Sequence, residues 1–306
     1  MTAYTVTQAS RALSEDLPGE DKQPVDKSDK NQSPETIGIF DSGVGGLSVA
    51  KCIRQYLPRE QLIYVADSGY APYGEKSIEF ITERVNLIAR QLISLNAKAL
   101  VIACNTATVN AIDQLRAQIP LPVIGVEPAI KPAARQSRNK KIAILATSAT
   151  ASNQRFLALV EKYRAGSDVL IQPCPGLVEL IEQGKFNSPE CSTLLQEYLH
   201  PLITQGIDTL VLGCTHYPFL QERIQLIAGS HIKVIETATP VTLELKRQLD
   251  RHQLSAPANQ TGNIRFFSSA LNVKANPKLN PQYVLAQHQL FSGLWQEPVS
   301  LEVLPV

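Results

Sequence analysis

The chain has 306 residues, of which 44% are apolar and 19% charged, an ordinary globular composition with enough length for two α/β domains. The formal net charge of +1 gives no indication of a nucleic-acid or membrane partner, no apolar run reaches transmembrane length, and the N-terminus lacks the apolar core of a signal peptide. Five scattered cysteines fit a reducing compartment, so we expect a cytoplasmic protein without a disulfide framework.

Residues 1–35 are mostly charged and small polar residues that cannot bury a core, and we expect a disordered tail there. From Ile37 onward, short β-rich runs alternate with helical patterns. The clearest helix is expected at 77–95, where apolar residues recur at steps of three and four. Continuous apolar strands between helices indicate parallel sheets covered on both faces. Strands are expected at residues 37–41, 62–66, 99–103, 142–146, 169–172, 209–212 and 232–235.

A faint internal repeat runs through these elements. The strand that leads into Asp41–Ser42 matches the strand that leads into Thr147–Ser148. The run ALVIACNT at 99–106 matches TLVLGCTH at 209–216, with cysteine on cysteine. The offsets between the matches are similar, which predicts two similar α/β halves.

Polar residues follow the ends of the predicted strands. Asp41, Cys104 and Cys214 all lie at such ends. In open α/β sheets, ligands bind beyond the carboxyl ends of the strands. If the two halves face each other, Cys104 and Cys214 approach one central ligand from opposite sides.

The two cysteines have matched settings. Cys104 follows a strand and opens a helix expected at 105–117, and Cys214 repeats this arrangement before Pro218. The dipole and free N–H groups of a helix N-terminus favour a thiolate, so we expect usable thiolate near neutral pH. A single cysteine is more often a small buried apolar residue, but two in matched settings indicate function. His216 is the expected proton-handling partner of Cys214.

A Gly-rich turn, DSGVGG, follows the first strand from Asp41. Ser48 stands where a G-x-G-x-x-G motif needs its last glycine, so a nucleotide-binding loop is a weak interpretation. We expect the backbone N–H groups of the turn to approach a small anion such as a carboxylate. Asp41 either caps the helix or lies beside a substrate amine. The turn Ala71–Pro72–Tyr73–Gly74 lies at the same rim and is either a β-turn or a source of backbone donors for a second carboxylate.

Three other chemistries fit the cysteines less well. Zinc sites usually cluster their ligands as C-x₂₋₄-C, and these cysteines are far apart in the chain. A cysteine hydrolase needs one cysteine with a histidine base and leaves the second matched cysteine unexplained. No lysine lies inside the Cys or Gly motifs, so nothing indicates a pyridoxal Schiff base. We therefore expect no metal and no cofactor.

With these motifs the sequence resembles the glutamate racemases of the aspartate/glutamate racemase superfamily. The resemblance covers about Ile37 to Leu249 and continues weakly through IRFFSSA to the C-terminus. The HYP after Cys214 and the APYGEK block favour glutamate over aspartate. The blocks that carry it, in the family's order and spacing, are IGIFDSGVGGLSV, YVADSGYAPYGEK, ALVIACNTAT, GVEP, ILATSAT and LVLGCTHYPFL.

The resemblance implies an α/β fold with two pseudo-symmetric three-layer α/β domains, each with a parallel sheet, and an active site in the cleft between them. The second domain is an insertion in the first. The first is expected to comprise 36–127 plus 237–306, and the second 128–236. The tail and the insert 271–282 depart from the compact family pattern, and neither carries a predicted catalytic residue.

The same resemblance implies a cofactor-independent interconversion of L- and D-glutamate that supplies D-glutamate for peptidoglycan. Cys104 is expected to take the proton from D-glutamate, and Cys214 from L-glutamate. Asp41 is implied to support Cys104, and His216 and Glu182 to support Cys214, although Glu182 read alone is an ordinary solvated helix residue. The implied substrate-binding residues are Asp41, Ser42, Pro72, Tyr73, Gly74, Asn105, Thr106, Thr215 and His216.

Partners follow from the same resemblance. Some glutamate racemases with N-terminal extensions respond to the peptidoglycan precursor UDP-N-acetylmuramoyl-alanine, which implies that activator here. The sequence does not define the oligomeric state, and a homodimer is the assembly that we consider. Two alternatives stay open: another amino-acid racemase of the superfamily, such as an aspartate racemase, and a non-catalytic small-acid binding protein. Paired cysteines favour an enzyme, because a binding protein does not need thiols at both rims.

Overall fold

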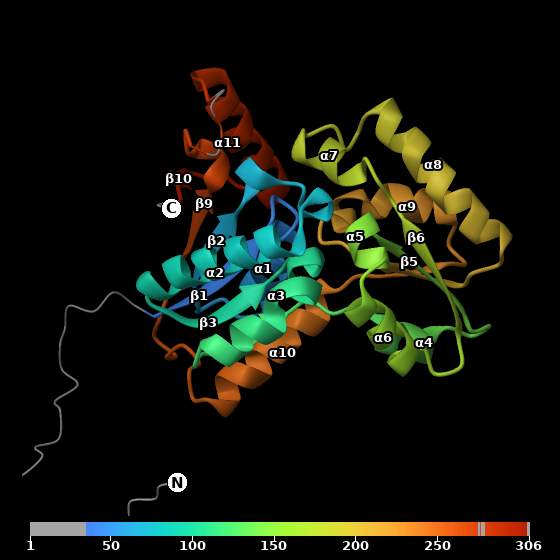
Figure 1. The fold of residues 1–306 in the computed structure, drawn as a ribbon, viewed down its shortest axis with the longest axis horizontal. Coiled ribbons are helices and arrows are strands. Elements are labelled where there is room, and N and C mark those ends of the chain that lie inside the picture. Colours follow the sequence, from blue (N-terminus) through green and yellow to red (C-terminus); the bar gives the residue numbers. More distant parts are fainter. Residues whose placement is uncertain (1–34, 275, 277–278, 305–306) are drawn as a thin grey trace, which may run out of the picture. The chain divides into compact units, whose positions relative to one another are not determined.

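The computed structural model describes residues 35–274, 276 and 279–304. Residues 1–34 of the expected tail lie outside the described residues, as do 275 and 277–278 of the expected insert. From Glu35 onward the described residues belong to one unit, drawn as a ribbon in Figure 1.

Two parallel sheets form the centre of this unit. The first sheet contains β1 (Thr36–Asp41), β2 (Gln61–Ala66), β3 (Ala97–Ile102), β4 (Val123–Gly125), β9 (Ile264–Ser268) and β10 (Leu301–Val303). The second sheet contains β5 (Lys141–Ala146), β6 (Asp168–Pro173), β7 (Thr209–Leu212) and β8 (Lys233–Ile235).

The strand orders of the two sheets repeat. The first sheet runs β10-β9-β2-β1-β3-β4 and the second runs β6-β5-β7-β8. Four strands of the first sheet therefore match the whole second sheet, with β1 on β5, β2 on β6, β3 on β7 and β4 on β8. This confirms the predicted class of two similar α/β halves with parallel sheets. The domain boundaries at 36–127 plus 237–306 and at 128–236 stay a prediction.

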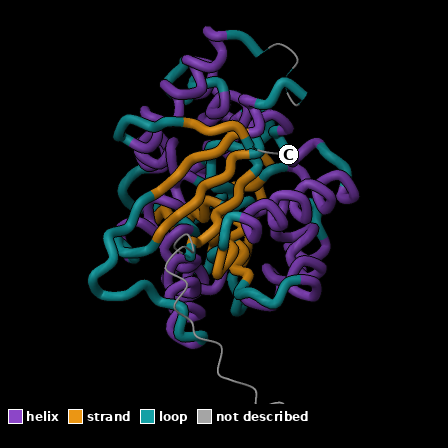
Figure 2. Tube along the Cα trace, turned by 90° about the vertical axis from the view of Figure 1, so that its left-hand side faces the viewer, coloured by secondary structure: helices purple, strands orange, loops and turns teal. Residues whose placement is uncertain are grey.

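Helices surround the strands, as Figure 2 shows. None of the helices in the described part of the chain is long and apolar enough to cross a membrane. The α-helices are α1 (Leu47–Tyr56), α2 (Ile78–Ser94), α3 (Asn105–Gln118), α4 (Ile130–Gln136), α5 (Ser148–Ala151), α6 (Gln154–Tyr163), α7 (Leu177–Glu182), α8 (Pro189–Thr204), α9 (Gln221–Ala228), α10 (Ala238–Arg251) and α11 (Pro281–Trp295). The 3₁₀ turns are η1 (Ser68–Tyr70), η2 (Tyr73–Glu75), η3 (Tyr217–Leu220) and η4 (Ser269–Leu271).

Alternate strand residues enter different apolar cores, as expected for sheets that are covered on both faces. In β1, Ile39 packs in the core under α1, whereas Phe40 packs in the core under α2 and α3. In β5, Leu145 lies in the same core as Ile39, and Ile144 lies in a third core with α4 and α6. The two sheets therefore share one apolar core, which holds their carboxyl ends near each other.

All seven predicted strands are present, with ends within two residues of the prediction. The helix predicted at 77–95 is α2, and it begins after Ser77, whose hydroxyl accepts a hydrogen bond from the Phe80 N–H (3.2 Å). The helix predicted at 105–117 is α3. The sequence reasoning did not predict β4, β9 or β10, which are short strands of three to five residues.

Candidate active site

The loops that follow the strands of the two sheets meet around a cavity of about 20 Å³. The cysteines come from equivalent places, Cys104 two residues after β3 and Cys214 two residues after β7. Every predicted substrate-binding residue except Asp41 lines this cavity, together with both cysteines. The lining residues are Ser42, Pro72, Tyr73, Gly74, Cys104, Asn105, Thr106, Thr147, Val178, Cys214, Thr215 and His216.

Cys104 is held at the first turn of α3. Its Sγ accepts a hydrogen bond from the Ala107 N–H (3.4 Å) and donates one to Ser42 Oγ (3.4 Å). The pKa of the Cys104 thiol is raised to about 12, chiefly by burial and next by the negative charge of Asp41. The hydrogen bonds to Ser42 and Ala107 lower this pKa by less. In contrast to the thiolate expected at a helix N-terminus, Cys104 is therefore a thiol near neutral pH.

Asp41 ends β1 and is fully buried. Its Oδ1 accepts a hydrogen bond from the Gly43 N–H (2.8 Å) and its Oδ2 accepts one from Thr215 Oγ1 (2.9 Å). Ser42 Oγ also lies 3.5 Å from Oδ1. Burial raises the pKa of Asp41, and the charge of His216 and the two shorter hydrogen bonds oppose that rise. Because Thr215 follows β7, its contact with Asp41 joins the two halves at the site.

A second chain of contacts supports Cys214. The Nδ1 of His216 lies 3.7 Å from Cys214 Sγ, and its Nε2 lies 2.6 Å from Glu182 Oε1. Burial alone would lower the pKa of His216, but the contacts with Cys214 and Glu182 outweigh it and raise the pKa well above its usual value. His216 therefore lies between a sulfur and a carboxylate, and its contacts with both favour the charged form of the ring. Glu182 thus contacts His216, which lines the cavity, although its sequence context alone indicated a solvated helix residue.

Glu182 is fixed by the Gly-rich turn of the opposite half. Its Oε1 accepts a hydrogen bond from the Val44 N–H (2.7 Å). A Cβ atom at Gly43 would collide with the Glu182 carboxylate, and one at Gly45 would collide with the His216 ring. The turn was expected to bind a small anion such as a carboxylate, and the carboxylate that it contacts is that of Glu182. The glycines give room for side chains of the other half.

The Pro72–Tyr73–Gly74 segment is anchored by residues that the sequence reasoning missed. Tyr73 donates a hydrogen bond from its hydroxyl to Asp67 Oδ2 (2.6 Å). Arg84 of α2 donates two more to the same carboxylate, at 2.9 and 2.7 Å. Asp67 is fully buried, so this paired charge fixes the loop after β2 against α2.

Thr147 and Val178 also line the cavity and were not predicted. Thr147 Oγ1 lies 3.1 Å from Thr106 Oγ1, across the two halves. The internal repeat carried a signal for Thr147, because Thr147 directly follows β5 as Ser42 directly follows the equivalent β1. Val178 lies in the short helix α7, and no motif marked it.

Within the described ranges, no group of three or more His, Cys, Asp and Glu side chains could hold a metal ion. The polar groups at the cavity instead form two separate hydrogen-bonded sets, each ending at one sulfur. That arrangement can give and take protons on two sides of a small molecule.

The sequence of this site is that of a known family. The family model described as Asp/Glu/Hydantoin racemase matches residues 37–242. The matched stretch contains Asp41, both cavity cysteines, Glu182 and His216. The chain belongs to the Asp/Glu/Hydantoin racemase family, and it is an isomerase.

Curated relatives narrow the similarity to one branch of that family. A glutamate racemase from Ectopseudomonas mendocina is 50% identical over 242 residues, which cover 78% of this chain and 91% of the relative. A glutamate racemase from Pseudomonas aeruginosa is 47% identical over 236 residues, covering 77% and 89%. The branch that this chain resembles is thus the glutamate racemases.

Solved structures agree with this similarity. Escherichia coli glutamate racemase, in complex with L-glutamate and the activator UDP-MurNAc-Ala, has a TM-score of 0.75 and 30% identity, covering 89% of this chain and 98% of that one. Francisella tularensis glutamate racemase, in complex with D-glutamate, has a TM-score of 0.74 and 28% identity, covering 88% and 97%. The fold of this chain is therefore that of known glutamate racemases.

Proposed function

We propose that this protein interconverts L- and D-glutamate by moving the Cα proton between Cys104 and Cys214, without a cofactor. One observation carries the proposal: two thiols from equivalent strand ends of two similar halves line the same cavity. The glutamate specificity rests on the names of the relatives, whose sequences match most of this chain.

The reaction itself favours two bases. Racemisation removes a weakly acidic Cα proton and returns a proton on the opposite face. A single base would have to move across the substrate, whereas a thiolate and a thiol on opposite faces exchange roles when the reaction reverses. Cysteine suits this task, because its ordinary pKa of about 8.5 lies near neutral pH.

The two supporting sets suggest how the roles divide. A protonated His216 beside Cys214 stabilises negative charge on that sulfur, and the raised pKa of Cys104 keeps its proton in place. The resting site is then set to accept L-glutamate, with Cys214 as the base and Cys104 as the acid. In the reverse direction Cys104 takes the proton from D-glutamate. Asp41 supports Cys104 by acting through Ser42, as Glu182 supports Cys214 by acting through His216.

The carbanion intermediate needs stabilisation without an electron sink. Ser42, Asn105, Thr106 and Thr215 line the cavity, and we expect their backbone and side-chain donors to hold the substrate carboxylates. A cavity needs about 10–15 Å³ to hold one water, so a cavity of about 20 Å³ is too small for glutamate. The arrangement is therefore a closed one, and substrate binding requires the loops around it to separate. Closure then excludes water from the reacting atoms.

An isotope experiment tests the two-thiol assignment. Purified protein converts L-glutamate in heavy water, and deuterium at Cα is followed early in both enantiomers. Two thiols that exchange with solvent between turnovers place deuterium in the D-glutamate product and leave the remaining L-glutamate largely unlabelled. Equal early labelling of both pools would instead mean a single base, and no D-glutamate at all would remove the proposed activity.

The biological role follows from the product. We propose that the protein acts in the cytoplasm and supplies D-glutamate for peptidoglycan. We also propose the homodimer as its assembly, and 36–127 plus 237–306 and 128–236 as its domains. Sedimentation at several concentrations tests the dimer, and a single monomeric species throughout would contradict it.

An activator is a further part of this proposal. The Escherichia coli relative was crystallised with UDP-MurNAc-Ala, and that compound is the activator that we propose for this chain. Because L- and D-glutamate have equal free energies, it must raise kcat/KM by the same factor in both directions. Kinetics with and without the compound test this, in the full chain and in a chain that lacks residues 1–35. Unchanged kinetics of the full chain would remove the activator, and an identical response without the tail would remove the tail's role.

A further inference from the structure

Tyr64 lies in β2, and the reaction proposed above makes no use of its hydroxyl. The side chain is fully buried, and the hydroxyl donates a hydrogen bond to the carbonyl oxygen of Gly43 (2.6 Å). Gly43 belongs to the Gly-rich turn that follows β1, the strand that pairs with β2. The phenol of β2 therefore holds one peptide group of this turn.

The same peptide group also contacts Glu182. The carbonyl of Gly43 and the N–H of Val44 belong to one planar peptide unit and point in opposite directions. The Val44 N–H donates to Glu182 Oε1 (2.7 Å), and that oxygen lies 2.6 Å from His216 Nε2. Tyr64 and Glu182 therefore bind the two ends of one peptide unit.

A hydrogen bond at one end of a peptide unit strengthens the hydrogen bond at its other end. Linked hydrogen bonds polarise one another in the low dielectric of a protein interior. The Tyr64 hydroxyl draws electron density toward the Gly43 carbonyl oxygen, which makes the Val44 N–H a stronger donor. Because glycine is conformationally permissive, the orientation of this peptide also depends on its hydrogen bonds. Tyr64 thus strengthens and directs the contact with Glu182.

The Tyr64 hydroxyl remains a donor near neutral pH. Burial raises the pKa of Tyr64 well above its ordinary value, and the negative charges of Asp41 and Glu182 raise it further. Tyr64 does not line the cavity that holds the two sulfurs. Its contribution is therefore a fixed dipole behind the reacting groups and not a proton transfer.

Aromatic side chains from the C-terminal part of the chain hold the ring of Tyr64. Phe266 of β9 and Phe291 of α11 each meet this ring edge-on, with 6.3 Å between the ring centroids. Trp295 packs edge-on against Phe266, with 5.2 Å between centroids. Edge-to-face pairs at this spacing are favourable. Elements beyond residue 242, where the family match ends, thus direct the Tyr64 hydroxyl.

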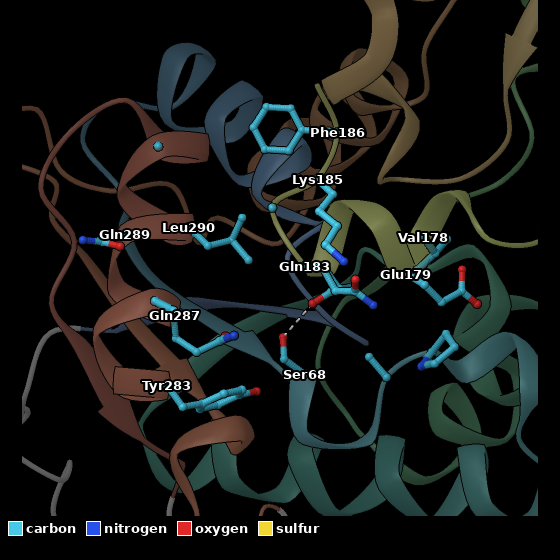
Figure 3. Close-up of a pocket in the computed structure, with 16 residues that line it drawn as sticks. Ser68, Val178, Glu179, Gln183, Lys185, Phe186, Tyr283, Gln287, Gln289 and Leu290 are labelled. Atoms are coloured by element: carbon cyan, nitrogen blue, oxygen red, sulfur yellow. Dashed lines mark hydrogen bonds between the residues drawn. The ribbon is translucent and has the colours of Figure 1, made fainter. Parts of the chain in front are cut away.

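The other oxygen of Glu182 is held from the same half. Ser68 follows β2, and its Oγ donates to Glu182 Oε2 (3.2 Å), drawn as the dashed line in Figure 3. The contact with His216 is made by Oε1, the oxygen that Tyr64 reaches through the peptide. We therefore expect Tyr64 to affect His216 more than Ser68 does.

We propose that Tyr64 is a positioning residue for the Cys214 side of the reaction. It acts on Glu182 through the Gly43–Val44 peptide. Glu182 in turn holds the ring of His216 at the sulfur. The proposal rests on the two-thiol function proposed above, and it adds a residue of the opposite half to the support of Cys214.

Tyr64→Phe removes the hydroxyl and keeps the ring. Loss of one neutral hydrogen bond should reduce kcat/KM about fivefold, equally in both directions because the equilibrium constant is one. The primary isotope effect should grow with α-deuterated L-glutamate and shrink with α-deuterated D-glutamate, since the Cys214 step becomes more limiting. Tyr198→Phe removes another hydroxyl that donates to a backbone carbonyl, that of Pro175 (2.8 Å), and should leave both isotope effects unchanged.

A double variant locates the path. Glu182→Ala removes the carboxylate that accepts from Val44. Adding Tyr64→Phe to Glu182→Ala should then reduce kcat/KM hardly any further, because residues that act through one contact are not additive. A residue that supports only the fold would reduce kcat/KM by the same factor in both backgrounds.

The amide proton of Val44 gives a measurement that is independent of turnover. Its chemical shift should move upfield in Tyr64→Phe, because the N–H becomes a weaker donor. Replacing Tyr64 by 3-fluorotyrosine keeps the hydroxyl and makes it a stronger donor, so the same proton should move downfield. This second replacement tests the peptide path even if Tyr64→Phe does not fold.

Several results would overturn the role of Tyr64. These are unchanged isotope effects in Tyr64→Phe, isotope effects that change in the same direction for both enantiomers, the full fivefold loss on top of Glu182→Ala, and a Val44 amide proton that does not move. Failure of the two-thiol function is recognised separately, because Cys104→Ala or Cys214→Ala would then keep racemase activity.

Discussion

The two cysteine sides of the cavity begin from equivalent strand ends and are supported in different ways. Cys104 caps α3, a helix of 14 residues, and its supporting carboxylate, Asp41, comes from the neighbouring strand and is fully buried. Cys214 precedes the short turn η3. Its supporting carboxylate, Glu182, comes from α7, reaches Cys214 through His216 and itself lines a second cavity of about 870 Å³.

The two sulfurs thus have different neighbouring side chains, although the proposed reaction treats two mirror-image substrates. The two substrates are mirror images, but the free enzyme has only one resting protonation state. Burial raises the pKa of Cys104 to about 12, so that this sulfur holds its proton, whereas Cys214 lies 3.7 Å from the imidazole of His216. The halves share a strand order, whereas different side chains surround the two sulfurs.

The largest expected effect comes from removing either sulfur. Cys104→Ala and Cys214→Ala should each reduce racemisation by about ten thousandfold in both directions, the upper range for general acid–base catalysis. Cys191→Ala removes a buried thiol of α8 away from the cavity and serves as the control. A coupled assay for D-glutamate, with circular dichroism to monitor folding, measures the effect. Substantial activity in one cysteine variant alone would break the equivalence of the two sides.

Glu182→Gln should have the next largest effect. It replaces a short, charge-assisted contact of 2.6 Å with His216, and such a contact contributes up to about 3 kcal/mol, or about a hundredfold in rate. Because the equilibrium constant is one, kcat/KM must fall equally in both directions. The primary isotope effect should nevertheless grow with α-deuterated L-glutamate and shrink with α-deuterated D-glutamate, since the Cys214 step becomes limiting. Equal changes in both isotope effects would contradict the assignment.

Asp41→Asn should reduce the rate less than Glu182→Gln does, and it should change the two isotope effects in the opposite direction. Asp41 acts on Cys104 through Ser42 at 3.5 Å, so we expect a loss of about tenfold, the size of one weaker charged contact. The isotope effect should now grow with α-deuterated D-glutamate, because the Cys104 step is slowed. Near-normal turnover in a folded Asp41→Asn variant would refute the role of Asp41.

The same substitution should have a small effect on stability. Because burial raises the folded pKa of Asp41 above its unfolded value of 3.8, its contribution is full below pH 3.8 and is lost as pH rises through the folded pKa. Asp41→Asn removes the cost of burying an ionised carboxylate. It should therefore raise Tm at pH 7 by a few degrees, the shift that about 1 kcal/mol of stability produces in a chain of this length. The gain should vanish near pH 3. A lower Tm at pH 7 would show that the hydrogen bonds of the carboxylate outweigh its desolvation.

Much of this arrangement could be predicted from sequence because it repeats. Apolar runs between helices gave seven strands, and the matched cysteines indicated one site between two halves. The strands β4, β9 and β10 were missed, although β7 and β8 are equally short. Pro120 and Pro122 before β4 indicate a turn, and β9 and β10 lie outside the internal repeat. Thr147 could have been found from the same repeat.

Other parts depend on contacts that no local pattern encodes. Glu182 lies in a helix of six residues, too short for its periodicity to define which face is buried. Its role depends on His216, which lies 34 residues away in the chain. The pair of Asp67 and Arg84 behind Tyr73 is likewise a tertiary contact. The high pKa of Cys104 could not be predicted either, because desolvation depends on how completely the folded protein surrounds the sulfur.

The Gly-rich turn has a consequence for how such a protein evolves. Gly43 and Gly45 leave no room for a methyl group because Glu182 and His216 of the other half occupy that space. An alanine at either position would be harmful by itself and tolerable only together with a shorter side chain opposite. Substitutions at these positions are therefore coupled between the two halves. A change in the Gly-rich turn requires a compensating change in the side chain opposite it.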